Sequence, residues 1–271
     1  MAIRRSNDAV LKDLSSYNKV YQNSTYVDRR KDQYETLVRN YYSLISDFYE
    51  HMWHRIFHLA NRFHCETFAQ SLQRHESYLA LKIQLKPGNK VLDLGCGIGG
   101  PLRCIAYLTG AHVTGITIRS YQVQRAKTIG IPANCQFIEG DFMKLPFENN
   151  TFDHIYTVKA VCHAPDKAKC FAEVFRVLKP GGSFVGYDWC ITDKYDDKNR
   201  EHIGIKHLIE VTSASCQLKS TDELTLDLKS VCFTIEENRI IPEGDIPLIH
   251  SADNYASFFS FHSIYTKWYG A

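Results

Sequence analysis

The sequence lacks the features that mark several large classes of protein. Its nine cysteines form no CxxC pair and no regular ladder, whereas a disulfide-stapled secreted domain would be shorter and richer in cysteine. No run of about eighteen apolar residues could cross a membrane as a helix. The first residues contain no apolar core of the kind that a signal peptide needs. We therefore expect a cytoplasmic chain with reduced thiols, and contact with the surface of a membrane such as the endoplasmic reticulum stays open.

An excess of charge of either sign is also missing. The 32 Lys and Arg residues oppose 30 Asp and Glu residues, which leaves a formal net charge of +2. A protein whose main partner is nucleic acid usually carries a larger basic excess, so we expect no nucleic-acid partner. What the sequence does contain is an aromatic surplus, because 13% of its 271 residues are aromatic and sixteen of them are tyrosine.

Composition and periodicity divide the chain into four segments. Residues 1–33 are polar and charged, and we expect them to be a solvated, partly frayed lead-in. In residues 34–88, aromatic and apolar side chains recur at three- and four-residue steps, up to residue 63 and again from 68 to 83, which predicts two helices. Residues 89–241 alternate short apolar runs with helical patterns, and residues 242–271 form a short final segment.

The alternation in residues 89–241 predicts an α/β fold. Strands separated by single short helices imply right-handed crossovers and a Rossmann-like, mainly parallel sheet with helices on both faces. Ligands of such sheets bind beyond the carboxyl ends of the strands. The predicted strands are residues 90–94, 112–118, 136–139, 154–158 and 183–188.

The segment VLDLGCGIGG, residues 91–100, carries the sharpest signal in the chain. A buried strand runs into a turn in which Gly95 and Gly97 lack a Cβ atom, so the backbone can approach a ligand closely. Dinucleotide-binding proteins keep the strand end apolar and place a pyrophosphate at the following helix. Here Asp93 introduces an acid, which favours a ligand with cationic groups. S-Adenosylmethionine, with an ammonium and a sulfonium, is such a ligand.

Several further motifs agree with this interpretation. The glycine segment resembles the first motif of the Rossmann-like S-adenosylmethionine-dependent methyltransferases, and the wider pattern over residues 40–210 resembles one family among them, the sterol C-methyltransferases. The matching motifs are DFYE at 47–50, GCGIGGPLR at 95–103, GDFMK at 140–144, CHAP at 162–165, RVLKPG at 176–181 and YDWC at 187–190.

The resemblance implies a set of cofactor-binding residues. Asp141 matches the acid that accepts a hydrogen bond from the adenine amino group, and Phe142 matches the neighbour that packs on the ring. Thr117, helped by Gln122, stands where the superfamily usually has an acid for the ribose hydroxyls. The complete expected set is Asp93, Gly95, Cys96, Gly97, Thr117, Gln122, Asp141 and Phe142.

The resemblance also implies a sterol or sterol-like substrate, methylated on side-chain carbon C24, under a cover formed by residues 34–88. Attack by a side-chain alkene leaves a carbocation, which aromatic faces such as Tyr49 and Trp53 would stabilise without trapping it. An aromatic stripe at helical spacing is also what an ordinary core shows. His163 and Asp188, at the ends of the fourth and fifth strands, are the candidates for the proton acceptor.

Two departures from the family pattern leave other functions open. Lys159 replaces an acid just after the fourth strand, and the final segment is shorter than in the family, so we expect the last antiparallel strand to be missing. Lys159 could stabilise an enolate, which favours ring C4 methylation of a 3-oxo sterol. Methylation of another lipid-like molecule and binding without turnover are the remaining alternatives. His51, His54 and His58 share a helical face, but we expect no metal site because no carboxylate or cysteine accompanies them.

Overall fold

The computed structural model describes residues 7–21, 27–53, 58, 60–240 and 259–267. The helices are α1 Asn7–Tyr21, α2 Val27–Asp32, α3 Tyr34–Trp53, α4 Phe68–Lys82, α5 Gly100–Thr109, α6 Ser120–Ile129, the 3-10 turn η1 Val161–His163, α7 Lys167–Val177, α8 Arg200–Thr212 and α9 Thr221–Ser230. The strands are β1 Lys90–Leu94, β2 His112–Thr117, β3 Cys135–Glu139, β4 Phe152–Val158, β5 Leu178–Ile191, β6 Thr234–Ile240 and β7 Phe259–Lys267.

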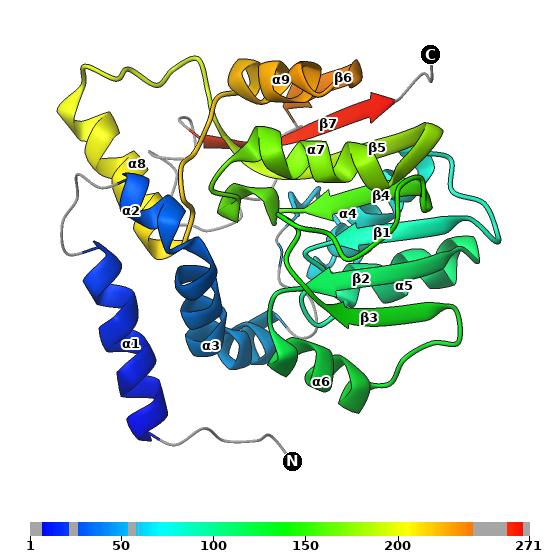
Figure 1. Cartoon of the computed structure of the whole chain (residues 1–271), viewed down its shortest axis with the longest axis horizontal. Helices are drawn as coiled ribbons and strands as arrows, with labels where there is room; N and C mark the ends of the chain where they lie inside the picture. Colours follow the sequence, from blue (N-terminus) through cyan, green and yellow to red (C-terminus); the bar gives the residue numbers. More distant parts are fainter. Residues whose placement is uncertain (1–6, 22–26, 54–57, 59, 241–258, 268–271) are drawn as a thin grey trace.

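The strands form one sheet in the order β3-β2-β1-β4-β5-β7-β6 (Figure 1). Strands β1 to β5 are parallel, which confirms the predicted Rossmann-like α/β fold. The expectation that the last antiparallel strand is missing is wrong. Strand β7 pairs antiparallel with β5 from Ser183 opposite Lys267 to Ile191 opposite Phe259, and it pairs with β6 on its other side. Its sequence FSFHSIYTK begins with the alternation of apolar and polar residues that is typical of a strand.

Helices cover both faces of the sheet. On one face, α4, α5 and α6 pack on the odd-numbered positions of β1, with Leu79, Leu102 and Val91 in one buried cluster. On the other face, α7 and α9 pack on the even-numbered positions, with Leu92 and Val174 in a second cluster. Helix α4 is therefore part of the core, and the role of residues 34–88 as a substrate cover stays a prediction.

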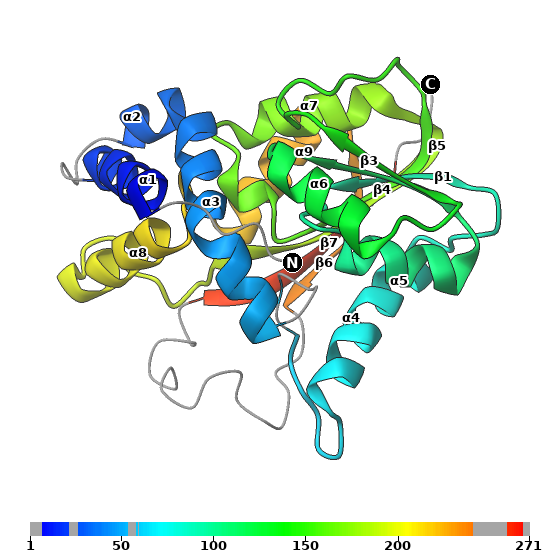
Figure 2. The same ribbon diagram turned by 90° about the horizontal axis from the view of Figure 1, so that it is seen from below.

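The N-terminal segment is more ordered than its polar composition suggested. Helix α1 packs against α3 and α8 (Figure 2): the Tyr17 ring lies 6.1 Å from the Tyr41 ring, and the Tyr17 hydroxyl donates to the carbonyl oxygen of Val211. The expected frayed lead-in is therefore wrong for residues 7–21 and 27–32. The predicted helix over residues 34–63 is also too long, because α3 ends at Trp53 and residues 60–63 are irregular.

Candidate active site

A cavity lies at the carboxyl ends of β1, β2 and β4, with α3 on its outer side. The eight residues expected to bind the cofactor all line it. The other lining residues are Tyr34, Val38, Tyr42, His58, Ile98, Gly100, Pro101, Ile118, Val158, Lys159, Ala160 and His163.

The turn after β1 has a backbone that only glycine fits at Gly95. Its φ is +83°, and a Cβ atom there would lie 2.3 Å from the Cβ atom of Ala160, which is far inside van der Waals contact. The N–H groups of Gly95 and Cys96 both donate to the carbonyl oxygen of Ile116, each at 3.0 Å, so β2 holds the turn in place. Gly97 continues it with a φ of +54°. The result is a cavity wall of bare backbone.

Asp93 places a buried carboxyl group in the same wall. Only 2% of the residue is exposed, and Oδ2 accepts a hydrogen bond of 3.0 Å from the Tyr156 hydroxyl. Burial raises the pKa of Asp93 to about 7, although the Tyr156 hydrogen bond acts in the opposite direction. A cationic ligand group beside Asp93 would favour the ionised carboxylate. The bare turn and this acid together fit the ammonium end of S-adenosylmethionine.

The residues expected at the ribose and adenine ends are held by the surrounding fold. The Thr117 hydroxyl donates to Oε1 of Gln122, and Nε2 of Gln122 lies 3.4 Å from the Ser46 hydroxyl on α3. Oδ1 of Asp141 accepts the N–H of Met143 at 2.7 Å. Burial raises the pKa of Tyr34, and the neighbouring Asp141 carboxylate adds to the rise. Polar groups of α3 therefore meet the cofactor-binding loops directly.

His163 is buried, 5% exposed, between the cavity and the loop after α8. Its Nδ1 lies 3.1 Å from the carbonyl oxygen of Ala214, and its Nε2 lies 2.9 Å from the Tyr42 hydroxyl. A carbonyl oxygen can only accept, so we assign the proton to Nδ1; Nε2 then accepts from Tyr42. Burial lowers the pKa of His163 to about 4, so the imidazole is neutral at physiological pH.

Lys159 lies in the cavity wall immediately after β4. Its backbone has a φ of +56°, and its N–H donates to the carbonyl oxygen of Tyr187 at 2.7 Å. Its Nζ is 5.7 Å from the centre of the Trp189 ring. Burial lowers the pKa of Lys159 to about 7, with Asp188 acting in the opposite direction. Lys159 therefore changes charge near neutral pH, instead of presenting a permanent ammonium to the cavity.

Asp188 is not among the residues that line this cavity. It lines a second, smaller cavity with Phe171, Phe184 and Leu224, on the face covered by α7 and α9. Because side chains alternate along a strand, Tyr187 faces α4 while Asp188 faces the opposite side. Burial raises the pKa of Asp188 to about 6. The expectation that Asp188 is a proton acceptor at the ligand is therefore corrected by its position.

The remaining catalytic candidates lie at the end of α3. Tyr49 and Trp53 belong to its last turns, but their side chains lie outside the described residues. Among the described residues no group of three His, Cys, Asp or Glu could hold a metal ion, and His51 and His54 lie outside that search. Tyr34 and Val38 also line the cavity, although no sequence motif marks them as site residues. Their spacing of four from each other and from Tyr42 was the available signal.

Comparisons with known proteins agree with this geometry. A methyltransferase domain model matches residues 92–186. The [4+2]-cyclase SpnF has a TM-score of 0.72 at 18% identity, covering 87% of this chain and 96% of that one. A geranyl diphosphate methyltransferase in complex with GPP and sinefungin has a TM-score of 0.71 at 18% identity, covering 86% and 98%. The domain match, together with the sequence relatives described next, places the chain among the S-adenosylmethionine-dependent methyltransferases.

Sequence relatives narrow that class. Cycloartenol-C-24-methyltransferase 1 of Oryza sativa subsp. japonica is 42% identical over 240 residues, 85% of this chain and 70% of the relative. The sterol 24-C-methyltransferase of Kluyveromyces lactis is 37% identical over 250 residues, 90% of this chain and 67% of the relative. The chain belongs to the sterol 24-C-methyltransferase family.

Proposed function

We propose that this enzyme transfers a methyl group from S-adenosylmethionine to side-chain carbon C24 of a sterol. The observation that carries the proposal is the 42% identity to a cycloartenol C-24-methyltransferase over 85% of the chain, combined with one cavity that gathers every expected cofactor-binding residue. When bound, S-adenosylmethionine supplies an electrophilic methyl group on a sulfonium.

The protein's own contribution is binding, orientation and charge. Asp93 and the bare turn at Gly95 would hold the ammonium end, and Asp141 and Phe142 would hold the adenine. Tyr42 on α3 supplies an aromatic face that stabilises a cation without trapping it. His163 is kept neutral by burial, so it does not repel positive charge in the substrate. Orientation of substrate and cofactor should account for most of the rate.

Lys159 favours a second candidate function, methylation of ring carbon C4 next to a 3-oxo group. Such a reaction passes through an enolate, which a protonated lysine in the cavity wall would stabilise. With a pKa of about 7, Lys159 supplies that charge only in part at neutral pH. This is why we place C24 methylation first.

The test is incubation with S-adenosylmethionine labelled in its methyl group and a panel containing a Δ24 sterol, a 3-oxo sterol and a non-sterol lipid. We expect label at C24 of the Δ24 sterol. Label at ring C4 would support the second candidate, and label in the non-sterol lipid would point to another substrate class. Cofactor binding by calorimetry without any transfer would identify a binding protein and contradict the proposal.

We also propose peripheral contact with a membrane, where sterols reside. No helix in the described ranges is both long enough and apolar enough to span a bilayer. Helices α1 and α8 contact each other and expose apolar side chains, among them Leu11 at 61% and Leu208 at 61%. Flotation with sterol-containing vesicles should weaken in Leu11→Glu and Leu208→Glu. It should not weaken in Leu226→Glu, which alters an equally exposed leucine on α9.

A further inference from the structure

We propose that Tyr42 removes the proton from the methylated substrate and passes its own phenol proton to His163, so that the two residues form a proton relay. The inference rests on the proposed function, since only attack by an alkene leaves a cation that must lose a proton. Tyr42 lies on α3, on the outer side of the cavity, whereas His163 ends η1 behind β4. Both side chains line the cavity.

The hydrogen-bond directions suit this role. The Ala214 carbonyl accepts from Nδ1, which leaves the lone pair of Nε2 facing the Tyr42 hydroxyl at 2.9 Å. A hydroxyl that donates its proton to a neighbour keeps lone pairs on its oxygen, so Oη can accept another proton. The pair can therefore take up a proton at the cavity surface and hold it one residue deeper.

The proton-removal step balances without any further reactant. A C–H bond next to the cationic carbon breaks, and its electron pair forms the new carbon–carbon double bond. The released proton goes to Oη of Tyr42 while the phenol proton goes to Nε2 of His163. Tyrosine is neutral before and after, and the positive charge of the carbocation ends on the imidazolium. Solvent takes that proton once the product has left.

The environment of His163 matches the demands of this step. An imidazolium present before methyl transfer would repel both the sulfonium and the developing carbocation. Burial prevents this by holding the pKa of His163 at about 4. A carbocation is so strong an acid that a weak acceptor suffices. Once charged, the imidazolium donates a stronger, charge-assisted hydrogen bond to Ala214.

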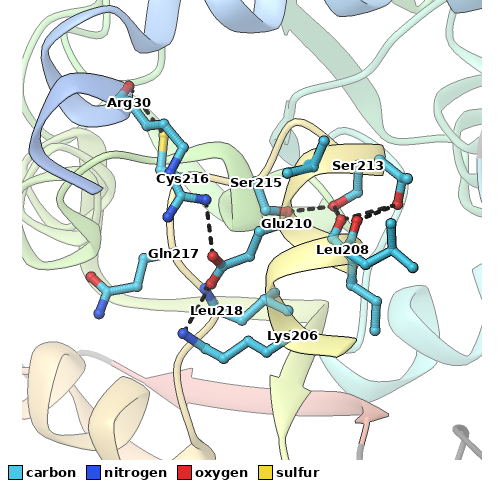
Figure 3. Close-up of polar contacts among 12 residues, drawn as sticks. Arg30, Lys206, Leu208, Glu210, Ser213, Ser215, Cys216, Gln217 and Leu218 are labelled. Atoms are coloured by element: carbon cyan, nitrogen blue, oxygen red, sulfur yellow. Dashed lines mark hydrogen bonds and ion pairs between the residues drawn. The ribbon is translucent and has the colours of Figure 1, made fainter. Parts of the chain in front are cut away.

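The turn that carries Ala214 is held by Glu210 of α8. Ala214 has a φ of +52°, and the N–H of Ser215 donates to the Glu210 carbonyl oxygen at 3.0 Å. Oε1 of Glu210 accepts the N–H of Leu218 at 3.0 Å, and Oε2 accepts from Nη1 of Arg30 at 2.9 Å. Figure 3 shows the Glu210 carboxylate directed at Arg30 and Lys206. The backbone oxygen of Glu210 thus holds the peptide whose carbonyl sets the His163 tautomer, and its carboxylate fixes the segment that follows this peptide.

The test separates methyl transfer from proton loss. Tyr42→Phe and His163→Asn are assayed with a labelled cofactor and a Δ24 sterol, counting total label transferred and the share found in alkene product. We expect the alkene share to fall at least about tenfold, with the missing label in a hydroxylated sterol formed when water traps the cation. Total methyl transfer should fall by a smaller factor than the alkene share does. Tyr17→Phe removes a phenol from α1, outside the cavity, and should leave the alkene share unchanged.

Each other outcome contradicts the relay in a distinguishable way. If both variants keep the wild-type alkene share, Tyr42 and His163 do not remove the proton. If methyl transfer and alkene formation fall together, the pair has only a structural role. If the Tyr42→Phe share is unchanged while the His163→Asn share falls, His163 acts without Tyr42. If the wild-type enzyme transfers no label to any Δ24 sterol, the proposed function fails and the relay fails with it.

Discussion

Replacing Glu210 by leucine should strongly destabilise the protein, because Glu210 of α8 pairs with Arg30 of α2. The side chains of Arg30 and Glu210 are only 5% and 4% exposed, with Nη1 and Oε2 2.9 Å apart. Breaking a buried ion pair by removing one partner costs about 3–5 kcal/mol, because the other charge stays buried. The N–H of Leu218 also loses its acceptor, which adds about 1–3 kcal/mol. We therefore expect a loss of roughly 4–8 kcal/mol.

Replacing the other partner, Arg30, should lower the free energy of unfolding by less. In Arg30→Met, Glu210 retains the N–H of Leu218 and the Nζ of Lys206, which lies 3.0 Å from Oε1, so we expect about 2–3 kcal/mol, below the usual range for a broken pair. The double variant Arg30→Met/Glu210→Leu buries neither charge. It should therefore be more stable than Glu210→Leu alone.

Urea unfolding followed by circular dichroism measures these differences as shifts of the midpoint. Glu35→Leu is the matched control, because Glu35 pairs with Arg39 at the surface, where the two side chains are 56% and 33% exposed, and such pairs contribute about 0–1 kcal/mol. If Glu210→Leu shifts the free energy of unfolding no more than Glu35→Leu does, the buried pair does not hold α2 to α8. If the double variant loses as much free energy of unfolding as the two single variants together, the side chains of Arg30 and Glu210 are not coupled.

Three further predictions concern the cavity. Asp93 has a pKa of about 7 in the free protein, so it ionises between pH 6 and pH 8, and this should tighten the binding of S-adenosylhomocysteine. The same ionisation should lower the free energy of unfolding of the free protein, because a carboxyl group whose pKa is raised by folding loses stability as the pH rises through that pKa. In calorimetry, Asp93→Asn should bind more weakly and show no such pH dependence. Gly95→Ala should lower the free energy of unfolding by about 2–4 kcal/mol, because of its positive φ and the clash with Ala160. Gly181 has a φ of +79° and open space around it, so Gly181→Ala should lower it by only about 1–2 kcal/mol in the same urea-unfolding assay. Lys159→Glu should change the rate on a Δ24 sterol at least about tenfold and abolish any activity on a 3-oxo sterol, because it replaces a buried, partly protonated lysine by an acid in the cavity wall. An unchanged rate on both substrates would show that Lys159 does not affect the reaction.

The parts of the fold that the sequence predicts best are those specified by local patterns. Each of the five parallel strands contains a run with apolar residues beside a helical pattern, so its identity depends mainly on nearby residues. The cofactor-binding residues were predictable because the turn at Gly95 and the acids Asp93 and Asp141 occupy fixed places after strands. All of the expected residues line one cavity, and their roles in binding the cofactor stay a prediction.

The errors arise where distant contacts decide the outcome. The polar composition of α1 predicts a solvated segment. The helix is instead held by contacts of Tyr17 with Tyr41 on α3 and with the Val211 carbonyl on α8, which lie far away in the sequence. Asp188 lines the smaller cavity on the face covered by α7 and α9, and it is not among the residues that line the cofactor cavity. The tautomer of His163 depends on Ala214, 51 residues later in the chain. None of these follows from periodicity.

The place of β7 in the sheet has a consequence for how the chain folds as it is synthesised. Strand β6 pairs with β7 in the described sheet, and β7 separates it from β5. A ribosome adding roughly 5–20 residues per second therefore completes residues 90–191 well before β6 can dock. Until residues 259–267 emerge, β5 presents an unpaired strand edge, which is where chains aggregate. The nascent chain should thus depend on chaperones mainly during this interval. Substitutions that weaken β7 should lower the soluble yield even where they change the free energy of unfolding of the folded protein only slightly.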